Sequence, residues 1–323
     1  MIKPVGIIAG EPNSISSEII FKSWKLRHKY RHKPFMIIGS IRLLNLQKKK
    51  LKYNIKFKEI NKNFKLKDLN GKNLPVYNVD YNQKKPFQKI SKISNKYIFK
   101  CFNIALNFVK NKKIIGFINC PVSKETLFKN KPHGITEFLS KKSALRDREV
   151  MLIYNKKLAV SPLTTHMNLS QVSKNINKLK IIKKIKVIDQ FYKKIFKRKP
   201  NIAILGLNPH NFSSRNISEE KNIIIPAIKK IKKGGIKVIG PISPDTSFTI
   251  FKKYKFDVIL GMYHDQVLTP FKALFNFDAI NITLGLSYIR ISPDHGVATN
   301  IIGKKIASPK SLIESIKFFN YIS

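Results

Sequence analysis

Residues 256–266 read FDVILGMYHDQ, an apolar run that ends in a polar turn carrying His264. Two other stretches have the same form, namely KLAVSPLTTH at residues 157–166 and NIAILGLNPH at residues 201–210. A short continuous apolar run is typical of a buried parallel strand, and open α/β sheets bind ligands at the carboxyl ends of their strands. We therefore expect the three turns to converge at one edge of a parallel sheet.

Each of these turns ends in or contains a histidine: His166, His210 and His264. A single histidine in such a position is more often an ordinary core or surface residue, but three of the chain's seven share it. Neutral imidazole binds zinc, cobalt, nickel and iron, and three protein ligands leave coordination positions open for a substrate oxygen. The pattern predicts a catalytic site for a divalent metal ion.

Outside these stretches, apolar strand-like runs alternate with lysine-rich amphipathic helical segments along the whole chain. This alternation is typical of βαβ units and predicts a mostly parallel sheet. The remaining strand-like runs lie at residues 4–10, 33–40, 74–79, 114–121, 149–155, 236–241 and 279–286. Helical patterns lie around residues 15–29, 40–50, 89–111 and 308–320, and the lysine-rich stretch 48–73 is expected to be a surface excursion.

The chain has 323 residues, of which 43% are hydrophobic, and a formal net charge of +45. A chain of this length can bury the core of two α/β domains or of one large one. The charge could serve nucleic-acid binding, since lysine and arginine neutralise phosphates. We favour a genome-wide drift toward the codons of lysine instead. Only eight of the 63 basic residues are arginine, although the guanidinium group is the preferred bidentate donor to phosphates and bases. We expect no dedicated nucleic-acid partner.

No stretch of 18 apolar residues suggests a membrane span, and the opening MIKPVGIIAGEP lacks a signal-peptide cleavage region. We therefore expect a cytoplasmic protein without a membrane partner. Cys101 and Cys120 show neither metal-binding nor redox spacing, so both are expected to be reduced. Neither GxGxxG nor GxxxxGKS/T occurs, so a dinucleotide would have to be held differently, and the candidate segment is residues 281–304.

A series of short motifs runs through the chain in a fixed order from about residue 6 to residue 307. The motifs are GEP, CPVSK, GITEFL, TTH, NPH, GPISPDTSF, MYHDQ, NITLGLSYIRISPDHG and IIGK. The series resembles the 4-hydroxythreonine-4-phosphate dehydrogenase family of vitamin B6 biosynthesis. The block from MYHDQ to DHG is highly specific, whereas GEP or TTH alone would carry no information.

The resemblance implies a homodimer whose subunits have the fold of isocitrate and isopropylmalate dehydrogenases, with two α/β/α domains and an active-site cleft between them. The first domain would comprise residues 1–125 and about 280–323, and the second about 126–279, with most metal ligands. The implied cofactors are NAD or NADP and one divalent ion per site, namely zinc, magnesium or cobalt.

The resemblance also assigns roles to residues, and the chemistry of their side chains fits these roles. Lysine and arginine bind phosphate or carboxylate, and threonine and asparagine hydrogen-bond to such oxygens. The two acids in the assignment could alternatively cap helices, and the lysine could be a solvated charge. By the resemblance, the metal ligands are His166, His210 and His264, and the catalytic residues are Lys272 and Asp265. The substrate-binding residues are Thr136, Lys272, Asn281 and Arg290. The cofactor-binding residues are Asp245, His295, Gly296 and Asn300.

The chain departs from the family pattern at several positions. Ile135 and Ser123 replace family histidines, and isoleucine can neither donate a hydrogen bond nor transfer a proton. His133 is the candidate to compensate in part. Asn300 replaces an acid of the cofactor loop, which leaves the preference between NAD and NADP open.

The activity implied is metal-assisted oxidation of 4-phosphooxy-L-threonine to a 3-keto acid, which loses carbon dioxide to give 3-amino-2-oxopropyl phosphate. Because of Ile135, the first alternative is a dehydrogenase of another phosphorylated hydroxy acid, such as threonate or erythronate 4-phosphate. The second alternative is a drifted, basic binding protein that has kept the fold without turnover. Retention of the three histidines and of Lys272, Asn281 and Arg290 favours an enzyme.

Overall fold

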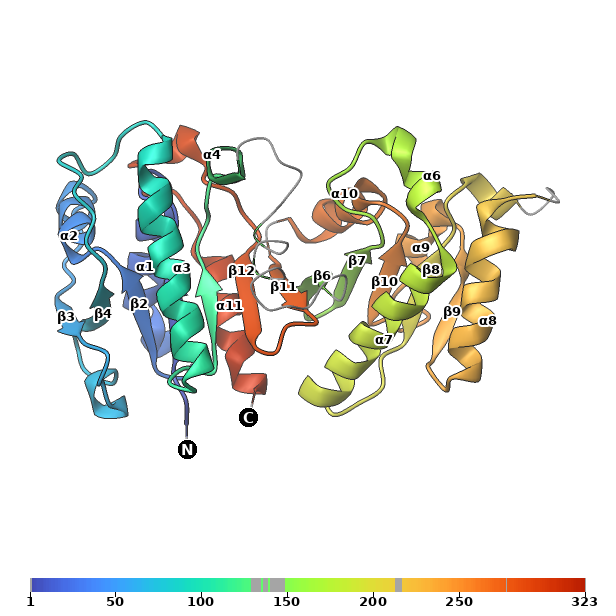
Figure 1. Cartoon of the computed structure of the whole chain (residues 1–323), viewed down its shortest axis with the longest axis horizontal. Helices are drawn as coiled ribbons and strands as arrows, with labels where there is room; N and C mark the ends of the chain where they lie inside the picture. The colour runs from blue at the N-terminus through green and yellow to red at the C-terminus, as the bar shows by residue number, and fades with distance from the viewer. Residues whose placement is uncertain are drawn as a thin grey trace. The chain divides into compact units, whose positions relative to one another are not determined.

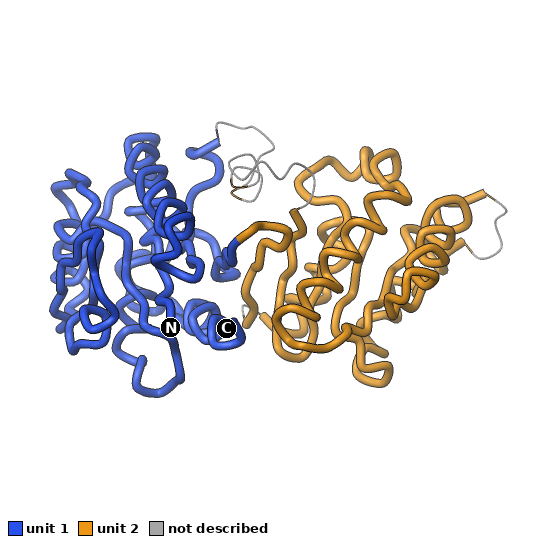
Figure 2. Tube along the Cα trace, turned by 60° about the horizontal axis from the view of Figure 1, so that its bottom comes forward, with its two compact units in different colours: residues 1–131, 288–323 blue, residues 132–287 orange. Residues whose placement is uncertain are grey.

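A computed structural model of the chain describes residues 2–128, 135, 139, 149–212, 217–276 and 278–322. The chain divides into two compact units (Figure 2). Unit 1 consists of Met1–Lys131 and Tyr288–Ser323, and unit 2 of Pro132–Ser287. Residues 280–287, expected in the first domain, lie in unit 2, because the strand that they contribute pairs with a strand of that unit.

Unit 1 is built on a sheet in which every described strand pair is parallel. The strand order is β3 (Phe57–Ile60), β4 (Leu74–Asn78), β2 (Phe35–Gly39), β1 (Val5–Ile8), β5 (Gly116–Asn119) and β12 (Ile289–Pro293). All residues of β1, β2 and β5 are buried, as expected of central parallel strands. The stretch 48–73 is not simply a surface excursion, because it contributes β3 to the edge of this sheet.

Helices cover both faces of the unit 1 sheet (Figure 1). On one face, α1 (Ser16–Lys25) packs against both α2 (Ile41–Lys50) and α11 (Lys310–Phe318). On the other face, α3 (Asn95–Lys110) packs against β1, β2 and β5. The short helices are η1 (Arg27–Lys29), η2 (Leu66–Asp68), η3 (Lys92–Ser94), α4 (Lys124–Phe128), η7 (Thr299–Ile301) and η8 (Phe319–Tyr321). This is the layered α/β arrangement predicted for the first domain.

Unit 2 has a mixed sheet, with the order β11 (Ile280–Leu284), β6 (Val150–Asn155), β7 (Leu158–Pro162), β10 (Val258–Gly261), β8 (Ile202–Leu205) and β9 (Val238–Ile242). The strands β7, β10, β8 and β9 are parallel. Strand β6 is antiparallel to both β11 and β7. Two residues join β6 to β7, and a connection this short allows only an antiparallel pair. The prediction of a mostly parallel sheet is confirmed.

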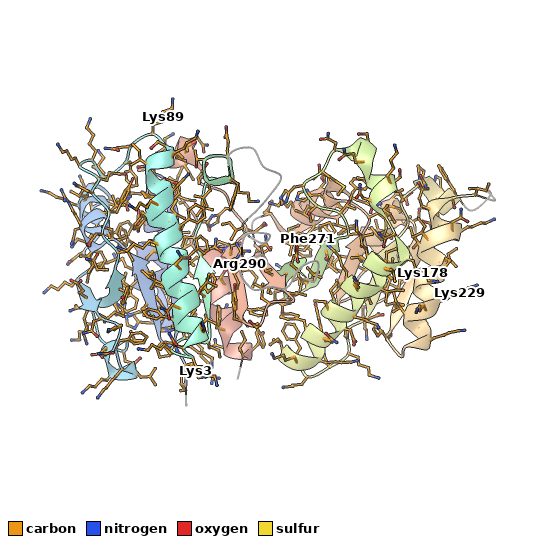
Figure 3. The ribbon with its side chains drawn as sticks, in the orientation of Figure 1. Lys3, Lys89, Lys178, Lys229, Phe271 and Arg290 are labelled. Atoms are coloured by element: carbon orange, nitrogen blue, oxygen red, sulfur yellow. The ribbon has the colours of Figure 1, made fainter. Side chains whose placement is uncertain are left out.

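The longer helices of unit 2 are α7 (Lys178–Ile195), α8 (Ile225–Lys233) and α10 (His264–Phe275). Helices α7 and α8 pack together in front of the sheet, and α10 packs against β7 and β10 on the other side (Figure 1). Phe271 of α10 is fully buried in a core with Val160, Ile259 and Phe256 (Figure 3). The short helices are η4 (Leu169–Gln171), α6 (Val172–Asn175), η5 (Pro209–Phe212), η6 (Glu220–Ile224) and α9 (Pro244–Ile250).

Exposed lysines project outward from both units. Lys3 and Lys89 of unit 1 and Lys178 and Lys229 of unit 2 are all exposed (Figure 3). No described helix combines the length and the apolar character needed to cross a membrane. Both cysteines are free and buried, and burial raises the pKa of the Cys101 thiol to about 12.

Candidate functional site

The three histidines follow three strands that are adjacent and parallel in unit 2. Strand β10 lies between β7 and β8, with Gly261 opposite Pro162 and Leu260 opposite Ile204. The carboxyl ends of these strands therefore meet at the same edge of the sheet, as the sequence predicts. His166 follows β7, His264 follows β10 and His210 follows β8.

The imidazole rings of His166 and His264 face each other, with their centroids 6.0 Å apart and their planes inclined by 40°. His264 is the first residue of α10, and its Nδ1 lies 2.6 Å from Oδ1 of Asp265. A carboxylate on one ring nitrogen fixes the orientation of the ring and leaves Nε2 as the nitrogen that can bind an ion. Asp265 thus orients His264.

His210 lies in a turn with an unusual backbone. His210, Asn211 and Phe212 have φ values of 48°, 56° and 41°, all in the left-handed region. This conformation costs each residue other than glycine about 1–2 kcal/mol. His210 is exposed and interacts electrostatically with Asp245, which lies in the first turn of α9. Backbone strain of this kind is concentrated at functional sites.

The histidines fit a divalent ion by their chemistry, but their present arrangement is incomplete. An imidazole nitrogen binds zinc at about 2.0–2.1 Å, so the rings of His166 and His264 are within reach of one shared ion. Among the described side chains, no group of three histidine, cysteine, aspartate or glutamate residues is gathered closely enough to hold a metal. The three-histidine site therefore stays a prediction.

Glu220 is a residue of this region that the sequence did not reveal. It is 1% exposed, and its Oε1 accepts hydrogen bonds from the backbone N–H groups of Leu207 and Asn208 at 2.8 and 2.9 Å. Burial by itself would raise the pKa of Glu220, but the hydrogen bonds from Asn208 and Leu207 outweigh it and lower the pKa. Glu220 is thus an ionised group that anchors the turn leading to His210.

Two residues predicted to bind the substrate, Lys272 and Asn281, lie in unit 2. Lys272 is half-buried on α10 and Asn281 lies on β11. The side-chain oxygen of Asn281 is buried and has no hydrogen-bond donor among the described residues, which is unusual for a buried acceptor and suits a ligand. Thr136 and His133 lie outside the described residues, and Ile135 is 4% exposed.

The other predicted residues belong to unit 1. Arg290 lies on β12, is 3% exposed and donates from Nε to Oδ1 of Asn119 at 2.7 Å (Figure 3). His295 and Gly296 follow β12, and Asn300 lies exposed in η7. A Cβ atom at Gly296 would meet nothing within 4 Å, so this backbone is open to a ligand.

The GEP motif places a buried carboxyl after β1 of unit 1. Glu11 is 1% exposed, and it accepts hydrogen bonds from the Asn13 backbone N–H at 3.2 Å and from the Ser94 hydroxyl at 3.0 Å. Burial raises the pKa of Glu11, and the two hydrogen bonds offset this only in part. Sequence analysis singled out the motif without finding this buried group.

Comparisons with known proteins identify the family of the chain. The model of the family described as pyridoxal phosphate biosynthetic protein PdxA matches residues 31–319. The chain is 39% identical, over 98% of its length and 97% of the relative, to the 4-hydroxythreonine-4-phosphate dehydrogenase of Sulfurihydrogenibium sp. (strain YO3AOP1). It is 31% identical, over 97% of its length and 96% of the relative, to an Oceanobacillus iheyensis protein provisionally named D-threonate 4-phosphate dehydrogenase.

Solved structures support the same grouping. The 4-hydroxythreonine-4-phosphate dehydrogenase of Klebsiella pneumoniae matches with a TM-score of 0.85 and 26% identity, covering 99% of this chain and all of that one. The isocitrate dehydrogenase of Methylococcus capsulatus matches at a TM-score of 0.51 and 10% identity, over 99% of this chain and 86% of that one. The second match concerns the fold alone, and it confirms the predicted isocitrate dehydrogenase-like fold.

Proposed function

Because the chain belongs to the family of pyridoxal phosphate biosynthetic protein PdxA, we propose that it is a 4-hydroxythreonine-4-phosphate dehydrogenase. The observation that carries the proposal is the sequence identity of 39% over nearly the whole chain to a relative of that name. The order of β7, β10 and β8 supports it from the structure, because it brings the histidine-bearing turns to one edge of the sheet.

The proposed reaction oxidises 4-phosphooxy-L-threonine. Its C3 hydroxyl gives up a proton to a base, and the hydrogen on C3 leaves with its electron pair as a hydride to a nicotinamide. The resulting 3-keto acid loses carbon dioxide, and the electrons of the broken carbon–carbon bond form an enolate. Protonation of that enolate gives 3-amino-2-oxopropyl phosphate.

We assign the residues of the chain to this chemistry by their side chains. His166, His210 and His264 would hold a divalent ion of zinc, cobalt or magnesium, which, when bound, stabilises negative charge on the C3 oxygen and on the enolate. Lys272 and Asp265 are the proposed catalytic residues. The side chains of Thr136, Asn281 and Arg290 would bind phosphate and carboxylate oxygens of the substrate.

The nicotinamide cofactor would be NAD or NADP, bound by the segment after β12. The proposed contacts are His295, Gly296 and Asn300, with Asp245 as a further acid. Asn300 keeps an acceptor oxygen for a ribose hydroxyl but brings no negative charge to repel a 2′-phosphate. We further propose that the protein works as a homodimer in the cytoplasm.

A second candidate function is the oxidation of D-threonate 4-phosphate or erythronate 4-phosphate. Two observations favour it, the buried isoleucine at position 135 and the 31% identity to the Oceanobacillus relative. The side chain of isoleucine cannot hydrogen-bond to a substrate or transfer a proton. If oxidation of 4-phosphooxy-L-threonine needs a histidine at position 135, that substrate would react more slowly with this protein.

The test is reduction of NAD and of NADP by the purified protein, followed by absorbance. Each cofactor is combined with 4-phosphooxy-L-threonine, D-threonate 4-phosphate or erythronate 4-phosphate, with and without a chelator. We expect turnover of 4-phosphooxy-L-threonine that the chelator abolishes and added divalent ion restores. Faster turnover of a phosphate without the amino group would select the second candidate, and turnover of none would favour a binding protein.

A further inference from the structure

The segment after β12 adopts backbone conformations that its residues disfavour. Ala298 and Lys305 have φ values of 48° and 63°, in the left-handed region, although both carry a Cβ atom. In this region the Cβ atom lies too close to the following carbonyl oxygen. Strain of this kind persists only where the surrounding structure holds it, and it is concentrated in segments that bind ligands. Contacts from outside residues 295–307 are therefore needed to keep the segment in this shape.

The ammonium group of Lys22, on α1, binds the end of this segment. Its Nζ donates to the carbonyl oxygen of Lys305 at 2.8 Å, to that of Ala307 at 2.7 Å and to Oε1 of Glu18 at 2.8 Å. A lysine ammonium has three protons to donate, and here each of them has an acceptor. Two of the three acceptors belong to the backbone of the segment, so Lys22 fixes where the segment ends on α1.

Glu18, one turn earlier on α1, binds the same stretch of backbone from the other side of the ion pair. It is 1% exposed, and its Oε1 accepts from the backbone N–H of Ala307 at 2.8 Å as well as from Lys22. Its other oxygen, Oε2, is buried and has no hydrogen-bond donor among the described residues. A carboxylate removed from water in this way needs an opposite charge beside it, and Lys22 supplies that charge. The two side chains therefore act as one unit.

The start of α1 holds the other end of the segment. The backbone N–H of Ile15, directly before α1, donates to the carbonyl oxygen of Val297 at 3.3 Å. Val297 is the residue before Ala298, and Lys305 is itself an acceptor of the α1 lysine. Each residue with a strained backbone thus lies at, or next to, a point where the segment is attached to α1.

A second ion pair of the chain shows what is particular to this one. On α7, Lys193 lies 2.6 Å from Asp189, an acid four residues earlier that is 4% exposed. One oxygen of Asp189 is buried without a donor among the described residues, as in Glu18, but the described residues offer Lys193 no backbone acceptor on another element. A pair of this spacing adds little to its own helix. Lys22 differs because its further acceptors lie 283 and 285 positions away along the chain.

We propose that Glu18 and Lys22 are positioning residues, which hold the segment after β12 in the shape that binds the nicotinamide cofactor. The inference rests on the proposed function, since it concerns the cofactor segment assigned there. Asn300 lies exposed between the two attachments to α1, and the open backbone of Gly296 leaves room for a ligand. A segment that is ordered before the cofactor arrives binds it more tightly, because less conformational freedom is lost on binding.

The experiment uses two variants and two measurements on the full chain. Lys22→Met keeps the length of the side chain and removes its three hydrogen bonds, and the double variant Glu18→Gln with Lys22→Met leaves no unpaired charge should the single variant not fold. Hydrogen–deuterium exchange without cofactor should be about tenfold faster or more at the amides of residues 295–307, because bonds to a charged group no longer hold them. Calorimetric titration should show NAD and NADP binding about tenfold more weakly, because only molecules that keep the shape bind.

Matched controls separate positioning from a general loss of stability. Lys193→Met, alone and with Asp189→Asn, removes the same charges from an ion pair of the same spacing in unit 2. These variants should lower the melting temperature and leave both the exchange of residues 295–307 and the affinity for NAD and NADP unchanged. In steady-state kinetics, Lys22→Met should raise KM for the cofactor and leave KM for the phosphorylated substrate within about threefold, because its bonds reach only the cofactor segment.

The outcomes are distinct. Unchanged exchange of residues 295–307 in both Lys22 variants overturns the positioning role, and so does an equal loss of cofactor affinity in the Lys193 controls. If the unsubstituted protein binds neither NAD nor NADP, the positioning role fails together with the cofactor part of the proposed function. If the unsubstituted protein binds a cofactor and the Lys22 variants bind it equally well, only the positioning role fails.

Discussion

Glu220 binds Asn208 twice, since its carboxylate accepts both the backbone N–H at 2.9 Å and the side-chain amide at 3.1 Å. Asn208 lies two residues before His210, in the turn where three consecutive residues adopt positive φ. A strained turn persists only when its surroundings hold it. Glu220 is part of what holds this one.

We predict that Glu220→Gln lowers the free energy of unfolding at pH 7 by about 1–3 kcal/mol, because the new amide nitrogen faces donors of Asn208. The folded-state pKa of Glu220 is lowered, so the stability it contributes is present above its unfolded pKa of about 4.3. This stability is lost as the pH falls through the folded-state pKa of Glu220. The difference in free energy of unfolding between the unsubstituted protein and Glu220→Gln should therefore shrink at low pH.

Urea unfolding at pH 7 and at pH 4 measures this difference. The control is Glu59→Gln, which removes the same charge from an exposed position in unit 1. A loss of stability as large in Glu59→Gln as in Glu220→Gln would show that net charge, and not the turn, is responsible.

Glu11 should behave in the opposite way. Its pKa is raised by burial, so the ionised side chain costs stability above its raised folded pKa, and the cost vanishes below the unfolded pKa. We predict that the free energy of unfolding of Glu11→Gln rises relative to that of the unsubstituted protein as the pH increases, because glutamine carries no charge whose burial costs stability. Thermal melting from pH 4 to pH 8 should show the gain growing with pH, and a gain independent of pH would contradict the argument.

The predicted metal ligands give a direct test. His210→Ala and His264→Ala should each lower the affinity for Co²⁺ or Zn²⁺ by at least about tenfold, because loss of a ligand exceeds typical losses from its supporting groups. His28→Ala, in an exposed segment of unit 1, is the control and should leave the titration unchanged. Titrations that are the same for all four proteins would remove the assignment.

Ile135 is the position where the chain and the family differ most in chemistry. General acid–base groups contribute about 10²–10⁴-fold to rate, so we predict that Ile135→His raises kcat/KM for 4-phosphooxy-L-threonine about tenfold or more. Steady-state kinetics on the two proteins measures the change, with D-threonate 4-phosphate as the comparison substrate. Flat or reduced activity, together with good turnover of the comparison substrate by the unsubstituted protein, would favour the second candidate function.

The net charge of +45 leads to a prediction about nucleic acids. Exposed lysines such as Lys3, Lys89, Lys178 and Lys229 are dispersed over elements of both units. We expect weak binding to duplex and single-stranded nucleic acid that falls steeply with salt and ignores sequence. Fluorescence anisotropy at several salt concentrations checks this, and nanomolar, sequence-selective binding at physiological salt would point to a dedicated partner.

The sequence predicted most of the sheet, because buried parallel strands are continuous apolar runs that stand out from lysine-rich helices. Each predicted run overlaps a strand of the structure. It did not predict β3 or β12, whose residues FKEI and IRISP mix charged or polar residues with apolar ones. β3 lies at the sheet edge, where solvent tolerates charge, and β12 buries Arg290 against Asn119.

By itself, the sequence determined the strand-ending turns of His166, His210 and His264, because local apolar runs and polar turns are written in consecutive residues. Only the tertiary structure decided that β10 lies between β7 and β8, so that these turns share one edge. It also decided that Gln266 and Glu220 reach the turn of His210 from residues 60 and 12 positions away. Contacts of this kind depend on the packing of distant segments, and no local pattern of residues encodes them.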